Sequence, residues 1–183
     1  TWNSKKIGKP FKITKHNAEV KKLIKSLPFS LTQSQITASQ DILRDLSSET
    51  PMNRLLQGDV GSGKTVVSSI AMYVAFLNGF QSVLMAPTEI LAMQHFKTIN
   101  NFLSKFGVTT ELVTGSNKLK TEKFDILVGT HSVLSDRIHF TTLGLIAIDE
   151  QPRFSVSQRG VIREKSKNAN QLTLTRQKER RVG

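Results

Sequence analysis

A glycine-rich segment near residue 60 has the residue types and spacing needed to hold a chain of phosphates. It follows the pattern G-x-x-x-x-G-K-[ST], which predicts a site for the phosphates of a nucleotide. Glycine lets the backbone bend so that successive N–H groups point at phosphate oxygens. The lysine supplies a mobile positive charge, and the threonine hydroxyl is a ligand for Mg²⁺. The predicted phosphate site consists of Gly58, Asp59, Val60, Gly61, Ser62, Gly63, Lys64 and Thr65.

Two carboxylates, Asp149 and Glu150, follow a second apolar run at residues 145–148. We predict that Asp149 holds Mg²⁺ through water beside Thr65. Glu150 is predicted to take a proton from the water that attacks the γ phosphate of ATP. Carboxylates are common at strand ends, so a merely solvated strand end is the alternative. The pair becomes specific because it occurs together with the phosphate segment.

The surrounding sequence predicts the elements that position these residues. A short apolar strand at 52–57 precedes the glycine segment, and an apolar helix at 66–77 follows it. Further strands are predicted at 82–86, 108–113, 124–128 and 143–148, with helices from residue 32 to 48 and from 89 to 106. Continuous apolar strands indicate burial on both faces, hence an α/β fold with a parallel sheet flanked by helices. Ligands of such sheets bind at the carboxyl ends of strands, where the polar tips lie.

Composition limits the class of protein. The chain has 183 residues, of which 38% are hydrophobic, so one globular domain with a sizeable core is expected. It contains no cysteine, which excludes disulfides and thiolate metal sites. Because no signal core and no run of 18 apolar residues occurs, we expect a soluble, cytoplasmic protein, and a monomer.

The net charge of +12 is concentrated at the two ends of the chain. Residues 1–26 hold eight lysines against one glutamate, and residues 159–183 hold eight basic residues against two acidic ones. The segment between them carries a net charge of −1. Attraction of the ends to nucleic acid and simple solvation of two charged flanks both remain open.

Four segments in order resemble the RecG family of superfamily 2 DNA helicases. They are MNRLLQGDVGSGKT at 52–65, APTEILAMQH at 86–95, VGTH at 128–131, and IDEQ at 148–151 followed by Arg153-Phe154. The resemblance covers residues 28–165, and Gln151 favours RecG over the related transcription-repair coupling translocases. It implies a single RecA-like P-loop NTPase lobe that uses ATP and Mg²⁺. It also implies remodelling of branched DNA in repair and recombination.

The resemblance assigns two further groups of residues. Phe29 and Gln35 would recognise adenine, although Gln35 is otherwise an exposed helix residue. Two strand-end loops would contact the backbone of branched or single-stranded DNA without reading its sequence. These loops are Pro87-Thr88 and Gly129-Thr130-His131. Alternatively they are ordinary turns, with Thr88 as a helix N-cap.

The other histidines carry no metal-ligand pattern. His95 and His139 have no partner at metal-ligand spacing, so we interpret both as surface or packing residues.

The chain also departs from the family pattern. Pro152 stands where the family has histidine, and Ser155 where it has glycine. Proline offers neither a side-chain hydrogen bond nor an N–H, which puts the coupling of hydrolysis to movement in doubt.

Outside the resemblance we interpret residues 1–27 as a basic linker that follows an absent DNA-binding wedge domain. Residues 166–183 are interpreted as a basic, disordered or aberrant end produced by truncation or a frame shift. Thr173 and Thr175 in that end are interpreted as a remnant of a Thr-Ala-Thr-Pro motif.

Two functions stay open after this reading. One is an ATP-dependent, RecG-like DNA helicase represented by its ATP-binding first lobe. The other is a nucleotide-responsive nucleic-acid-binding module without useful catalysis. A small-molecule kinase is disfavoured, because nothing resembles a lid or an acceptor site.

Overall fold

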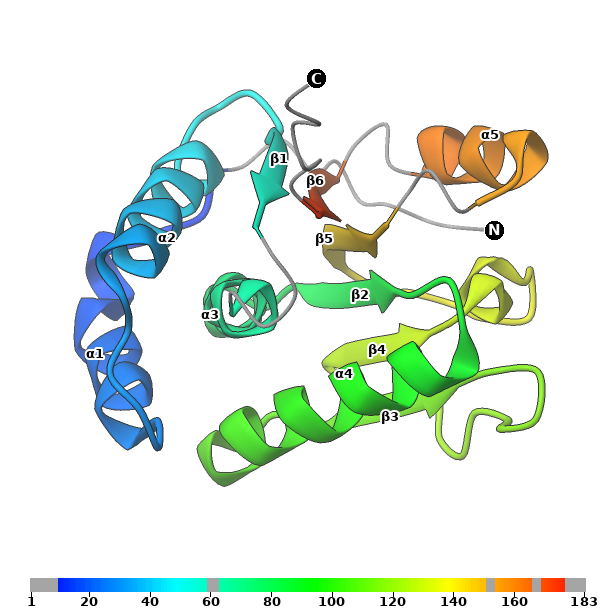
Figure 1. The fold of residues 1–183 in the computed structure, drawn as a ribbon, viewed down its shortest axis with the longest axis horizontal. Coiled ribbons are helices and arrows are strands. Elements are labelled where there is room, and N and C mark those ends of the chain that lie inside the picture. The colour runs from blue at the N-terminus through cyan, green and yellow to red at the C-terminus, as the bar shows by residue number, and fades with distance from the viewer. Residues whose placement is uncertain (1–9, 59–62, 151–153, 166–168, 177–183) are drawn as a thin grey trace, which may run out of the picture.

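The computed structural model describes residues 10–58, 63–150, 154–165 and 169–176 (Figure 1). In these residues six strands pair in parallel to form one sheet, in the order β1-β6-β5-β2-β4-β3. The strands are β1 (Asn53–Gln57), β2 (Gln81–Met85), β3 (Thr110–Val113), β4 (Ile126–Gly129), β5 (Leu143–Asp149) and β6 (Asn170–Thr175). The helices are α1 (Asn17–Ser26), α2 (Gln33–Leu46), α3 (Lys64–Leu77), α4 (Glu89–Leu103) and α5 (Val156–Lys165). The predicted parallel α/β fold is confirmed.

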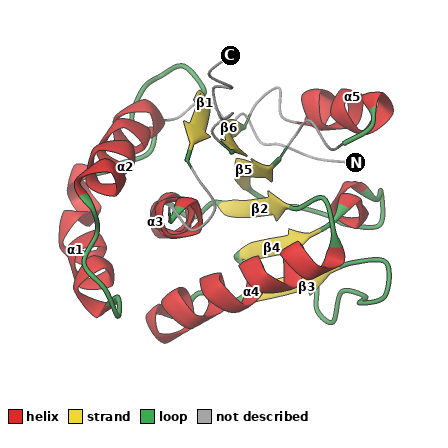
Figure 2. Cartoon of the chain, in the orientation of Figure 1, coloured by secondary structure: helices red, strands yellow, loops and turns green. Residues whose placement is uncertain are grey.

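Helices lie on both faces of the sheet (Figure 2). The side chains of α1 to α4 join one buried cluster, while α5 and the segment from Phe124 to Phe140 contribute to a second cluster on the other face. Within β2, Leu84 belongs to the first cluster, and its neighbours Val83 and Met85 belong to the second. This alternation explains the continuous apolar strands, because both faces of each central strand are covered.

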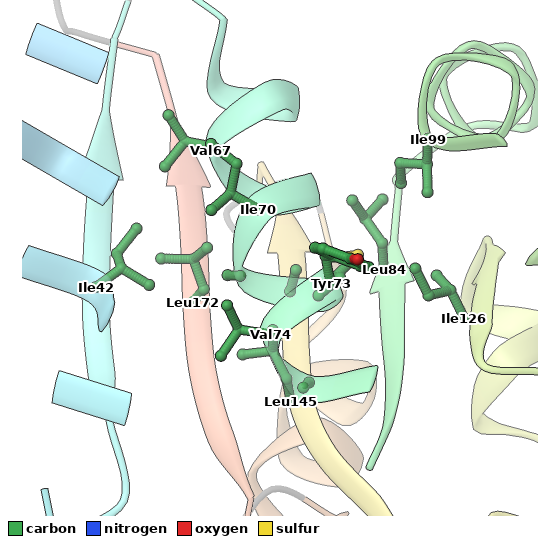
Figure 3. Packing of buried hydrophobic residues seen from close by; sticks show 14 of the residues in the cluster. Ile42, Val67, Ile70, Tyr73, Val74, Leu84, Ile99, Ile126, Leu145 and Leu172 are labelled. Atoms are coloured by element: carbon green, nitrogen blue, oxygen red, sulfur yellow. The ribbon is translucent and has the colours of Figure 1, made fainter. Parts of the chain in front are cut away.

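Helix α3 is the centre of the first cluster (Figure 3). It is buried along most of its length, and Ile70 and Val74 are at most 1% exposed. Ile42 of α2, Leu172 of β6 and Leu145 of β5 surround it. Burying one such side chain contributes roughly 1.5–3 kcal/mol. The helix that begins at the phosphate segment is therefore held firmly in place.

The sheet extends beyond residue 165, the end predicted for the lobe. Strand β6 lies between β1 and β5 and pairs with both. Its first residue, Asn170, is buried; its side chain accepts from the Met52 N–H at 2.7 Å and donates to the Gly144 carbonyl at 3.1 Å. The strand has polar residues among its leucines, so it lacked the continuous apolar signature of its neighbours. Residues 170–175 thus belong to the folded lobe.

The described part of the predicted N-terminal linker also packs on the lobe. Phe11 is 2% exposed and stacks on Phe80 with ring centroids 5.0 Å apart. Val20 and Leu23 of α1 are buried in the first cluster. The apolar stripe is short, and residues 1–26 also carry eight lysines, so the sequence did not show that this segment packs on the lobe. Residues 10–27 are therefore part of the structured lobe.

None of the helices in the described part of the chain has the length and apolar character needed to cross a bilayer.

Candidate nucleotide-binding site

The two described ends of the glycine segment lie at the carboxyl edge of the sheet. The Gly58 N–H donates to the Thr175 carbonyl of β6 at 3.2 Å, while Gly63 precedes the first residue of α3. Gly63 has φ +79°, and a Cβ there would collide with the side-chain amide of Gln35. Only glycine fits this position without strain. The predicted phosphate-site residues Asp59, Val60, Gly61 and Ser62 lie outside the described residues.

Lys64 is the first residue of α3, and its side chain extends back to Gly58. Its Nζ donates to the Gly58 carbonyl oxygen at 2.8 Å. The ammonium group is thereby held between the start of the glycine segment and the N-terminus of α3, whose dipole also favours anions. This arrangement suits a chain of phosphates.

Thr65 and Asp149, the two predicted Mg²⁺ ligands, meet at one imidazole. The Thr65 Oγ1 lies 3.2 Å from His95 Nδ1, and His95 Nε2 lies 2.7 Å from Asp149 Oδ2. The side chains of His95 and Asp149 are each only 11% exposed. A hydroxyl and a carboxylate are the oxygen ligands that Mg²⁺ prefers, so this donor set fits the ion.

His95 was interpreted as a surface or packing residue; the structure shows it mostly buried, and both of its ring nitrogens make polar contacts that the sequence did not indicate. It lies on the face of α4 that points toward the sheet, with Ala92, Phe96 and Ile99 at helical spacing. That spacing was the signal available in the sequence, because it places one imidazole on an otherwise apolar stripe.

Glu150 follows β5 in a backbone conformation that is unusual for a residue with a side chain. Its φ is 53°, and its N–H donates to the Leu174 carbonyl of β6 at 2.9 Å. Its Oε1 lies 2.7 Å from Nε of Arg176, whose side chain is 51% exposed. Such strained conformations cluster at functional sites. The predicted general base is thus hydrogen-bonded to the end of β6 and paired with Arg176, a residue that the sequence did not single out.

The residues predicted to recognise adenine lie at two different places. Gln35 completes a capping box at the start of α2: its Oε1 accepts from the Thr32 N–H at 2.9 Å, and the rest of its amide lies against Gly63. Phe29 is 44% exposed and meets Phe102 of α4 edge-on, with ring centroids 6.0 Å apart. Gln35 therefore contacts the phosphate segment directly, while recognition of the base stays a prediction for both residues.

The two loops predicted to contact DNA are neighbours. They follow β2 and β4, and the Ala86 N–H donates to the Gly129 carbonyl at 2.8 Å. Thr88 caps α4 by accepting from the Leu91 N–H at 3.3 Å, so the N-cap alternative for this residue is confirmed. In the first loop Pro87 is half-buried and Thr88 is exposed; in the second loop Thr130 is 4% exposed, whereas His131 is exposed. Contact with DNA stays a prediction.

The turn after β3 is hydrogen-bonded to the start of α4, next to the two loops described above. Glu89, in the first turn of α4, accepts from the Ser116 N–H at 3.0 Å and from its hydroxyl at 2.9 Å. The bonds from the Ser116 hydroxyl and N–H lower the pKa of the Glu89 carboxyl. This contact joins the turn after β3 to the start of α4.

The departures from the family pattern are described only in part. Gln151, Pro152 and Arg153 lie outside the described residues, so the effect of Pro152 stays a prediction. Ser155 is exposed; its N–H donates to Gln158 Oε1 at 3.0 Å at the start of α5.

Comparison with known proteins agrees with this geometry. A family model described as DEAD/DEAH box helicase matches residues 32–182, and the chain belongs to this family. Within it, the chain is 46% identical over 169 residues to the ATP-dependent DNA helicase RecG of Bacillus subtilis, covering 87% of this chain and 25% of that protein. It is 43% identical over 178 residues to RecG of Thermotoga maritima, covering 92% of this chain and 23% of that protein.

A solved structure of RecG bound to a three-way DNA junction matches with a TM-score of 0.74 and 42% identity, over 91% of this chain and 23% of that one. The resemblance to RecG drawn from the motifs is thus confirmed. The chain spans about a quarter of the length of the curated relatives it matches.

Proposed function

We propose that this lobe binds ATP with Mg²⁺ and supplies the nucleotide site of a RecG-like DNA helicase. One observation carries the proposal: residues from α3 and from the end of β5 meet beside the glycine segment. Thr65 and Asp149 contact the same imidazole, and the Lys64 ammonium donates to the Gly58 carbonyl. In the proposed site, Lys64 and the loop N–H groups bind the phosphates, and Thr65 and Asp149 hold Mg²⁺.

Glu150 is the proposed general base. Bound Mg²⁺ would neutralise charge on the phosphates. The Glu150 carboxylate would accept a proton from the attacking water, for which its side chain must leave or share the contact with Arg176. The left-handed backbone at Glu150 aims the residue away from the regular course of β5.

Nucleotide binding tests the site. Lys64→Ala should reduce the affinity of the 183-residue chain for MgATP by at least ~10-fold, since a hydrogen bond to a charged group contributes about 1.5–3 kcal/mol. Lys97→Ala is the matched control, because Lys97 is an exposed lysine on α4. Binding can be followed by titration calorimetry. Equal affinity of both variants and the unchanged chain would refute the site assignment.

A nucleotide-responsive binding module without useful catalysis is the second candidate. The contact that favours it is the pairing of Glu150 with Arg176, which occupies the proposed base. Phosphate release in the presence of DNA separates the candidates. Release above that of a Glu150→Gln variant supports hydrolysis, whereas equal rates support the binding module.

DNA, bound through its backbone, is the proposed partner of the loops at Pro87-Thr88 and Gly129-Thr130-His131. The RecG in the matched structure is bound to a DNA junction, and the present loops lie side by side at the carboxyl edge of the sheet. Branched and single-stranded DNA should bind without sequence preference. His131→Ala should weaken binding equally across sequences in fluorescence anisotropy, and His139→Ala, another exposed histidine, should not.

We further propose that the chain is a monomer and acts in the cytoplasm, where a protein that remodels bacterial DNA would meet its substrate. A single sedimenting species of 20.4 kDa would support the monomer.

A further inference from the structure

His95 connects the two proposed ligands of Mg²⁺ through its two ring nitrogens. Its Nδ1 lies 3.2 Å from Thr65 Oγ1, and its Nε2 lies 2.7 Å from Asp149 Oδ2. The three residues come from α4, from α3 and from the end of β5. The imidazole thus bridges the two proposed ligands.

The carboxylate sets the direction of one hydrogen bond, and in a neutral ring the second direction follows from it. A carboxylate only accepts, so Nε2 carries the proton and donates to Asp149. In the neutral ring Nδ1 is then an acceptor, and the Thr65 hydroxyl donates to it. A hydroxyl that donates its proton keeps its oxygen lone pairs free for a cation. Asp149 has one oxygen occupied by His95, which fixes the plane of the carboxylate.

We propose that His95 is a positioning residue for the magnesium ligands: it orients the hydroxyl of Thr65 and the carboxylate of Asp149 before the ion arrives. The proposal rests on the nucleotide site proposed above. Partners of this kind orient metal ligands and raise metal affinity. A packing role alone would not need a polar ring, since the neighbouring inward positions of α4 are Ala92, Phe96 and Ile99.

Metal dependence of nucleotide binding separates positioning from packing. The affinity for ATP is measured by titration calorimetry with EDTA and then over a range of Mg²⁺ concentrations. His95→Phe keeps an aromatic ring of similar size and removes both hydrogen bonds. We expect unchanged affinity in EDTA and a ~10–100-fold higher Mg²⁺ requirement, the usual cost of losing such a partner. His139→Ala serves as the control, because His139 is exposed and precedes the start of β5, whereas Asp149 lies at the other end of that strand.

Two conservative variants test which contact matters more. Gln can place an N–H donor near the position of Nε2, and Asn can place an acceptor near that of Nδ1. Because the bond to Asp149 is shorter and charge-assisted, His95→Gln should recover more of the Mg²⁺ affinity than His95→Asn. In the metal-free chain, ¹⁵N spectra of the His95 ring should show the tautomer protonated at Nε2.

Three outcomes would overturn the proposal. They are an unchanged Mg²⁺ requirement in His95→Phe, an equal loss of affinity with and without metal, and a ring protonated at Nδ1. The failure of this inference is distinguishable from that of the proposed function. If Lys64→Ala still binds MgATP, the nucleotide site itself is wrong. If Lys64→Ala loses binding while His95→Phe keeps its metal dependence, only the role of His95 is wrong.

Discussion

Replacing Asn170 by alanine tests whether the strand at residues 170–175 holds the sheet together. The side chain accepts from the Met52 N–H at 2.7 Å and donates to the Gly144 carbonyl at 3.1 Å, and Asn170 is only 7% exposed. Alanine would leave two buried backbone groups without these partners. Each such group costs about 1–3 kcal/mol, so the free energy of unfolding should fall by about 2–6 kcal/mol. That is a large part of the ~5–15 kcal/mol typical of a domain.

Urea unfolding followed by circular dichroism measures this loss. With an m value of about 2 kcal/mol/M, the urea midpoint should fall by about 1–3 M at constant slope. Gln171→Ala is the control, because this neighbour is partly exposed and its side chain makes one weak hydrogen bond, to Thr173 at 3.4 Å. Asn170→Asp keeps the acceptor and loses the donor, so it should also destabilise. If Asn170→Ala and Gln171→Ala differ by less than ~0.5 kcal/mol, the reasoning is refuted.

Three further predictions address other contacts. Phe11→Ala should lower the free energy of unfolding by about 3 kcal/mol or more, the usual cost of removing a buried ring, whereas a linker residue would change urea unfolding little. The folded-state pKa of Glu89 is lowered by its hydrogen bonds from Ser116, so this contact stabilises the fold at neutral pH and is lost as pH falls through that pKa. The Ser116 amide signal in NMR spectra should titrate with a midpoint below the ordinary pKa of a glutamate. Arg176→Gln should lower the free energy of unfolding by less than ~1 kcal/mol, because the Arg176 side chain of its pair with Glu150 is half exposed. This loss, measured by urea unfolding, should shrink at high salt, and a larger, salt-independent loss would contradict the prediction.

The fold could be predicted from the sequence wherever apolar runs were long and continuous. Strands β2, β4 and β5 and helices α3 and α4 correspond to predicted segments, with ends shifted by a few residues. Helix α5 was not predicted, because its exposed face carries Val156 and Val161 and its apolar pattern is weak. Strand β6 was not predicted as part of the lobe, because its polar residues are satisfied by neighbours that only the folded sheet brings together.

The site was predictable where a motif is contiguous. Lys64, Thr65, Asp149 and Glu150 could be proposed as site residues because their types are diagnostic at their spacing. His95 was not singled out because its contacts join residues far apart in the sequence: it lies 30 residues from Thr65 and 54 from Asp149. No local spacing rule links such residues, whereas the helical periodicity of α4 does show which face His95 occupies.

The position of β6 determines the distance between the phosphate segment, which follows β1, and the acidic pair Asp149 and Glu150 at the end of β5. Strands β1 and β5 are not neighbours, since β6 lies between them. Neighbouring strands are about 4.8 Å apart, so the ends of β1 and β5 are separated by roughly 10 Å. The end of β6 is hydrogen-bonded to the residues that follow β1 and β5. Its Thr175 carbonyl accepts from the Gly58 N–H, and its Leu174 carbonyl accepts from the Glu150 N–H.

The gap is therefore set by backbone contacts and crossed by side chains. The contact from Thr65 through His95 to Asp149 links the start of α3 to the end of β5. A variant with a weakened β6 should consequently lose nucleotide affinity along with stability. Asn170→Ala offers the comparison, because Asn170 lies at the far end of the strand from Thr175 and touches none of the proposed ligands. MgATP, by binding only the folded lobe, should restore part of its stability in proportion to ligand concentration. If saturating MgATP left the urea midpoint of this variant unchanged while still raising that of the unchanged chain, β6 would set the geometry of the site as well as the stability of the sheet.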